Sequence, residues 1–135
     1  MQPAVKKSER GQSLVEFALL LPIFLVLVLA VADFGWALRS FITATNSARE
    51  GARLGVTGAP ASAIQGRAVA TSANMLTTAD VTVSNPGGTP GSSVVVNVNT
   101  VYHYITPLVP MLHLLSGGTF PDPLPIKTSA TMRLE

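Results

Sequence analysis

The segment RGQSLVEFALLLPIFLVLVLAVADF, residues 10–34, decides the fold of this chain. Residues 14–32 contain one charged side chain, Glu16, and one proline, Pro22. As a helix this run is about 28 Å long, close to the roughly 30 Å thickness of the hydrocarbon core of a bilayer. A soluble protein of 135 residues could not bury a helix that is apolar on every face. The run is therefore predicted to span a membrane.

A secretory signal peptide is an alternative interpretation of the same segment. Basic residues between positions 6 and 10 precede the apolar run, and residues 30–32 form an A-x-A cleavage pattern. Cleavage after Ala32 would release a secreted or periplasmic binding domain. However, the carboxylate of Glu16 weakens the apolar region of such a signal, and the helical pattern continues past Asp33 without a break. We therefore prefer an interpretation in which the helix is retained.

The start of the apolar run suggests how it is processed. The basic leader ends at Gly11, Gln12 follows, and Glu16 stands five residues after the glycine, which resembles the processing site of type IV prepilins. The resemblance implies cleavage between Gly11 and Gln12 by a prepilin peptidase, with Phe17 following the acidic position. A carboxylate in the membrane costs roughly 2.5–3.5 kcal/mol on insertion scales, so a partner is expected.

The new α-amine of Gln12 on a neighbouring subunit would be such a partner, and the pairing of Gln12 with Glu16 would set the axial register between subunits. The alternative is that Glu16 reaches back to the cytoplasmic interface of the membrane.

One helix is expected from residue 12 to residue 56, well beyond the apolar run. Such a helix is about 67 Å long, and Pro22 should kink it because proline removes one backbone donor and crowds the preceding turn. Glu50 and Arg53 are spaced to form an ion pair one turn apart. Residues that recur every three or four positions form a predicted packing face, for the protein's own sheet or for neighbouring subunits. This face consists of Phe34, Leu38, Phe41, Thr45, Ala48 and Ala52.

Three short motifs together resemble one family. GQSLVEFALLLPIF, then ADFG, then NSAREGAR are similar to the TadE-like family, minor pseudopilin-type components of the tight adherence (Tad, type IVc) pilus system. The resemblance is carried by about the first 56 residues, and ATMRLE at the C-terminus suits the last strand of the family. It implies a bacterial envelope protein that takes part in assembly of adhesive Flp-type pili, in cell adhesion and biofilm formation. The implied partners are the membrane, other pilin or pseudopilin subunits, the Tad assembly machinery and a prepilin peptidase.

These interpretations divide the chain into three parts. Residues 1–11 are a basic leader, residues 12–56 the long helix with a membrane span at about 14–32, and residues 57–135 an extracytoplasmic α+β domain. Because long C-terminal domains translocate largely regardless of charge, the N-terminus is expected in the cytoplasm and the protein in the bacterial inner membrane as a single-pass protein. An uncleaved scaffold of the secretion machinery, with the same topology, remains an open alternative.

The C-terminal domain is predicted to have a pilin-like α+β fold. A short second helix is expected over residues 61–75, with a turn at 85–91. Segments rich in Val, Thr and Tyr predict a small antiparallel sheet with strands at 80–84, 92–106 and 125–134. Residues 107–125 are expected to form an irregular loop that packs on the sheet or contacts a subunit or the membrane. The candidate partner residues of this loop are Leu108, Met111, Leu112 and Leu115.

The sequence gives no indication of a catalytic site, a metal site or a nucleic-acid-binding surface. There is no cysteine, and the two histidines, His103 and His113, have only Asp122 as a nearby carboxylate in the sequence, which predicts no metal site. No phosphate-binding loop or nucleophile motif is present. The basic residues are scattered and the net charge is only +2, so nucleic acid is not an expected partner. We expect no enzymatic activity, no cofactor and no small-molecule substrate.

Overall fold

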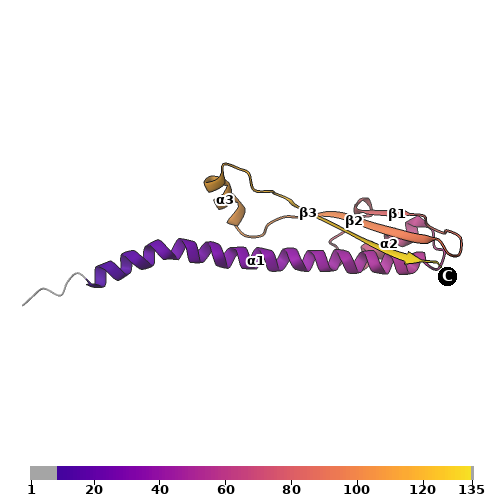
Figure 1. The fold of residues 1–135 in the computed structure, drawn as a ribbon, viewed down its shortest axis with the longest axis horizontal. Helices are drawn as coiled ribbons and strands as arrows, with labels where there is room; N and C mark the ends of the chain where they lie inside the picture. Colours follow the sequence, from indigo (N-terminus) through magenta and orange to yellow (C-terminus); the bar gives the residue numbers. More distant parts are fainter. Residues whose placement is uncertain (1–8, 135) are drawn as a thin grey trace, which may run out of the picture.

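One continuous helix organises the molecule. The computed structural model describes residues 9–134, except for the side chains of residues 9, 10 and 115. Helix α1 runs from Glu9 to Gly55, which confirms the predicted long N-terminal helix. Pro22 lies inside α1, and Figure 1 shows the indigo N-terminal end of the helix inclined to the rest of its axis. The remaining elements lie along the middle and the C-terminal half of α1, while its N-terminal part projects away from them.

The end of α1 packs closely against the sheet because it carries a glycine. A Cβ atom at Gly55 would lie 2.9 Å from Val94 Cγ2 and 3.2 Å from Ile64 Cδ1. The chain then turns through Gly58, whose φ of 79° is the left-handed conformation that glycine adopts without strain. Close approach and reversal at this point bring the rest of the chain back along α1.

Helix α2 is shorter than predicted. It spans Ala61–Ala70 rather than reaching residue 75. The hydroxyl of Thr71 donates to the Arg67 carbonyl at 3.0 Å and that of Ser72 to the Val69 carbonyl at 2.7 Å, so the side chains take up carbonyls of the last turn. The residues at 73 and 74 then have positive φ values of 51° and 64°, which ends the helix. A single turn of 3₁₀-helix, η1 (Thr78–Asp80), leads into the sheet.

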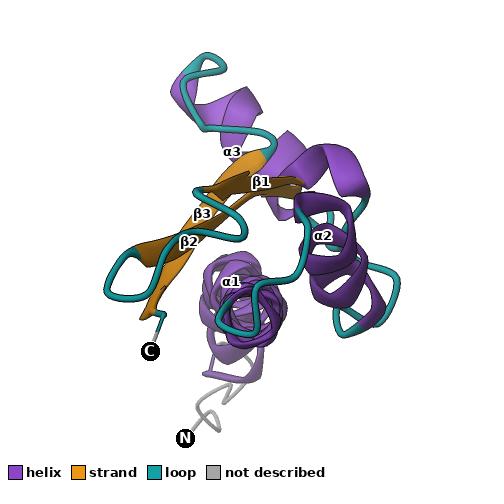
Figure 2. Ribbon diagram, turned by 90° about the vertical axis from the view of Figure 1, so that its right-hand side faces the viewer, coloured by secondary structure: helices purple, strands orange, loops and turns teal. Residues whose placement is uncertain are grey.

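The predicted antiparallel sheet is confirmed. It contains β1 (Val81–Ser84), β2 (Ser93–Tyr102) and β3 (Leu124–Arg133) in the order β1-β2-β3. Both pairings are antiparallel, with Val83 opposite Val96 and Val96 opposite Ala130. Figure 2 shows α1 and α2 on the same side of this sheet. The molecule is therefore a two-layer α+β structure with its core between the two helices and the sheet.

The core uses small residues on the helices and branched residues on the sheet. Alanines of α1 and α2 are buried against valines of the sheet, and small side chains allow the close packing of these layers. The principal buried residues are Ala44, Ala48, Ala52, Ile64, Ala68, Leu76, Val81, Val94, Val96, Val98, Tyr102, Ile126, Ala130 and Leu134.

The prediction of an irregular loop over residues 107–125 is wrong in its first half. A third helix, α3, spans Leu108–Ser116. Pro110 is tolerated because it stands in the first turn, where backbone N–H groups have no partner within the helix. Gly117, with a φ of 67°, ends α3 in the left-handed conformation, and an irregular connection then leads to β3. Figure 1 shows α3 beyond the end of the sheet that points toward the N-terminal part of α1.

Candidate functional site

A buried carboxylate lies immediately after the apolar run. Asp33 is only 2% exposed. Its Oδ1 accepts hydrogen bonds from the backbone N–H groups of Ile105 at 3.0 Å and Thr106 at 3.2 Å, and from the hydroxyl of Tyr102 at 3.4 Å. Its Oδ2 accepts a short hydrogen bond from the Thr106 hydroxyl. We call these four residues the Asp33 clamp.

The clamp keeps its carboxylate charged. Burial by itself raises the pKa of Asp33, but the hydrogen bonds from Thr106, Ile105 and Tyr102 outweigh burial, so the pKa lies below its ordinary value of 3.8. Burial and the adjacent charge of Asp33 raise the pKa of Tyr102. Burial, followed by the charges of Asp122 and Asp33, raises the pKa of Tyr104. At neutral pH the clamp therefore consists of an ionised carboxylate and neutral hydroxyl donors.

The clamp joins two distant parts of the sequence. Asp33 belongs to α1, one residue beyond the run that ends at Ala32, whereas Ile105 and Thr106 belong to the connection between β2 and α3. These hydrogen bonds fix the position of the C-terminal domain on α1, at the end of the predicted span. The sequence analysis considered Asp33 only as the residue after a cleavage pattern. The signal that could have identified it is a carboxylate at the edge of an apolar run with no cation within one helical turn.

The residues of the predicted processing site lie on an uncovered part of α1. Gly11, Gln12, Glu16 and Phe17 are all exposed. The side-chain amide of Gln12 donates to Glu16 Oε1 at 3.1 Å, a contact between successive turns of one helix. The cleavage itself and the pairing of Glu16 with a neighbouring α-amine stay predictions.

The predicted packing face of α1 has two environments. Ala48 and Ala52 are fully buried in the protein's own core, and the Thr45 hydroxyl lies 3.1 Å from that of Thr128 in β3. In contrast, Phe34, Leu38 and Phe41 are exposed, with exposed fractions of 71%, 47% and 45%. These three residues line an apolar groove of about 560 Å³ between α1 and the start of β3.

The predicted ion pair of α1 extends to α2. Arg53 lies 3.6 Å from Glu50, and Arg67 of α2 lies 3.4 Å from the other oxygen of the same carboxylate. Both arginines are exposed and Glu50 is half-buried, and pairs this close to solvent contribute at most about 1 kcal/mol. The pairs therefore support the contact between α1 and α2 only weakly.

The candidate partner residues around α3 also divide. Leu108 is 5% exposed and packs inward, as does the neighbouring Val109. Met111 and Leu112 are half-buried. Leu114, which was not among the candidates, is 88% exposed. The side chain of Leu115 lies outside the described part of the structure.

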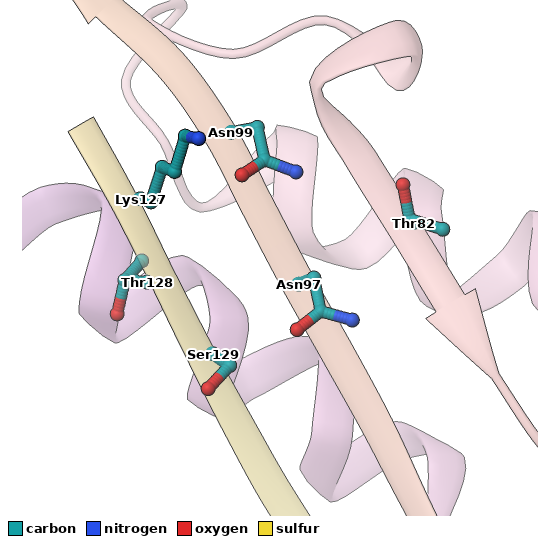
Figure 3. Close-up of a pocket in the computed structure, with 6 residues that line it drawn as sticks. All are labelled: Thr82, Asn97, Asn99, Lys127, Thr128 and Ser129. Atoms are coloured by element: carbon teal, nitrogen blue, oxygen red, sulfur yellow. The ribbon is translucent and has the colours of Figure 1, made fainter. Parts of the chain in front are cut away.

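The histidines and carboxylates that the structure describes do not gather into a metal site. No three of these side chains come close enough together to hold a metal ion. His113 Nε2 donates to the Phe120 carbonyl at 2.9 Å and so fixes the connection that follows α3. Figure 3 shows the polar hollow on the sheet, about 370 Å³ in volume, where Lys127 is the only lining residue with an ionisable side chain. The hollow is lined by Thr82, Asn97, Asn99, Lys127, Thr128 and Ser129.

Within the described residues, α1 is the one helix that is long and apolar enough to cross a membrane. Comparison with known proteins agrees with the motifs of this helix. The model of the family described as TadE-like protein matches residues 11–53. No curated protein and no solved structure matches the chain. The family prediction is thus confirmed over residues 11–53, and this N-terminal part of the chain is TadE-like.

Proposed function

We propose that the protein is a membrane-anchored, pseudopilin-type structural subunit that takes part in assembly of Tad pili. The observation that carries the proposal is the match of residues 11–53 to the TadE-like family, because this segment contains both the apolar run and the predicted processing site. The TadE-like family is associated with the Tad pilus system. Its partners here are the membrane and other subunits of that system.

The exposure of the N-terminal part of α1 supports the proposal that this part contacts lipid or other molecules. Between Gly11 and Leu25 every residue is exposed, although most of them are large and apolar. No other described part of the chain covers this stretch, and lipid or other helices are its proposed surroundings. Further along, Asp33 binds the C-terminal domain to the same helix. Such a molecule holds its domain at a fixed position relative to an anchor in the membrane.

The acidic position near the start of the run provides the proposed contact between subunits. Among the described side chains, Gln12 is the partner of Glu16, and a neutral amide does not neutralise a carboxylate. After cleavage following Gly11, the cationic α-amine of Gln12 on a neighbouring subunit would neutralise the carboxylate of Glu16. This pairing would set the axial offset between two packed helices.

The mature N-terminus is the test of this proposal. Mass spectrometry of the protein purified from its native host should identify a chain that begins at Gln12. A chain beginning at Asp33 would instead mean a released domain, and an intact Met1 would mean an uncleaved membrane scaffold. Either result would refute the proposed processing.

Substitution of Glu16 tests the role of the acid. Glu16→Ala and Glu16→Gln should both leave membrane insertion intact and reduce the yield of assembled pili, because both remove the charge. Glu16→Asp, which keeps the charge on a shorter side chain, is the matched control and should retain part of the yield of assembled pili. Normal pilus yield from Glu16→Gln would contradict the proposed pairing with an amine.

A further inference from the structure

We propose that α3 is a second membrane contact, a helix that lies in the interface of the outer leaflet beside the span. This inference rests on the proposed membrane anchoring of α1. The bilayer is the proposed occupant of the exposed surface of α3, and it is identified by the position, the composition and the exposure of that helix.

The position of α3 along α1 is set by the Asp33 clamp. Thr106 is bound to Asp33, and α3 begins at Leu108, two residues later. Figure 1 shows α3 beyond the end of the sheet that points toward the N-terminal part of α1, and Figure 2 shows it set off to one side of α1. The apolar run ends at Ala32, so α3 lies at the level of the last turns of the predicted span.

The burial of α1 agrees with this position. In the apolar run, Val26, Leu29 and Ala30 are half-buried while their neighbours are exposed. They precede Asp33 by seven, four and three residues, so they share its face of the helix. The covered stretch from Val26 to Asp33 is about 10 Å long. Interfacial helices bury their apolar faces about 5–10 Å into the boundary between headgroups and acyl chains.

The composition of this segment suits lipid rather than water. Residues 103–121 contain no Asp, Glu, Lys or Arg. Val109 faces inward at 1% exposed, whereas Leu114, about 140° further around the helix, is 88% exposed. A helix with apolar side chains on both its inner and its outer face is not suited to bulk water.

Other exposed residues mark the same level. Trp36 is 45% exposed and lies one turn beyond Asp33, with the guanidinium of Arg39 5.1 Å from its ring. Ile105 and Phe120, on either side of α3, are 63% and 41% exposed. Trp and Arg are typical of the interface between membrane and water, so the belt formed by these residues continues the surface of the span.

Depth-dependent quenching tests this assignment. The full-length protein, in a Trp36→Phe background, would carry a single tryptophan at Leu114→Trp and be reconstituted in phosphatidylcholine nanodiscs, one copy per disc. Matched variants place the tryptophan in the span, at Leu20→Trp, or on the outer face of the sheet, at Thr82→Trp. Lipids brominated at defined acyl positions and aqueous acrylamide are the two quenchers.

We expect brominated lipid to quench Leu114→Trp nearly as strongly as Leu20→Trp, most of all with bromine near the headgroup, and to leave Thr82→Trp unaffected. If Leu20→Trp is quenched by lipid but Leu114→Trp only by acrylamide, α3 lies in water and the inference is wrong while the anchor stands. Shielding of Leu114→Trp from both quenchers would indicate contact with protein and would also overturn it. Failure of lipid to quench Leu20→Trp would refute the membrane anchor itself, and the proposed function with it.

Discussion

The substitution Asp33→Ala is expected to release the connection before α3 from α1 while the sheet stays folded. The carboxylate accepts hydrogen bonds from two backbone N–H groups, of Ile105 and Thr106, and from the hydroxyls of Thr106 and Tyr102. Hydrogen bonds to a charged group contribute about 1.5–3 kcal/mol each. Ile105 is exposed and Thr106 half-buried, so their N–H groups can turn to water once the clamp opens. We therefore expect a local loss of about 2–4 kcal/mol, less than the sum of the four bonds.

Amide hydrogen exchange of the full chain in detergent micelles measures this loss directly. The amides of Ile105 and Thr106 should lose about 30-fold to several-hundred-fold of their protection in Asp33→Ala, since every 1.4 kcal/mol is a factor of ten. The amides of Val96 and Val98 lie in the core of β2 and provide an internal reference that should not change. Local opening thus becomes distinguishable from global unfolding.

Two further variants control for the size and the charge of the side chain. Asp33→Asn keeps one acceptor oxygen in place and should lose less protection than Asp33→Ala. Glu50→Gln removes a half-buried carboxylate, distant from the clamp, from the same helix and should leave protection at residues 105 and 106 unchanged. Undiminished protection of Ile105 and Thr106 in Asp33→Ala would refute the clamp, and an equal loss throughout the sheet would show that Asp33 supports the whole fold instead.

Two other predictions concern acid and packing. The hydrogen bonds of the clamp hold the pKa of Asp33 below 3.8. The clamp should therefore contribute its full stability above pH 3.8 and lose it as the pH falls through the folded-state pKa. A difference in stability between wild type and Asp33→Asn that does not shrink in acid would contradict this. Gly55→Ala should destabilise the domain by about 1–3 kcal/mol in chemical unfolding, because its Cβ would lie 2.9 Å from Val94. The matched control is Gly66→Ala in α2, where a Cβ would meet nothing within 4 Å. This substitution should stabilise the domain by about 0.5–1 kcal/mol. Equal effects of the two substitutions would refute the packing argument.

The sequence predicted those elements whose pattern is local and repetitive. The apolar run and the three-and-four spacing beyond it specify α1, and alternation from Ile126 to Leu134 specifies β3. In both cases the side chains that must be covered recur at the period of the element. Prediction of α2 was less accurate, because hydroxyl groups at 71 and 72 bind backbone carbonyls and end the helix where its small residues alone would let it continue.

The features that sequence reasoning missed depend on contacts between distant residues. Residues 107–125, with five prolines and two glycines, were expected to form an irregular loop, yet Pro110 falls in the first turn of α3 and Gly117 just after its end, where both are compatible with a helix. Asp33 was missed because its partners are some seventy positions away in the sequence. The sequence around Asp33 indicates that this carboxylate needs a partner, but it does not indicate that backbone N–H groups of another segment supply it.

The two acids at the ends of the apolar run lead to opposite expectations. At the C-terminal end of the run, the chain itself supplies four hydrogen bonds to Asp33, so this charge is satisfied within one molecule. At the N-terminal end, the partner that the described side chains give Glu16 is the neutral amide of Gln12, and Glu16 is exposed. A carboxylate in an apolar run whose described partner is only a neutral amide favours recognition by a second molecule. Asp33 thus orients the domain on its helix, and Glu16 is the acid that we propose selects a neighbour.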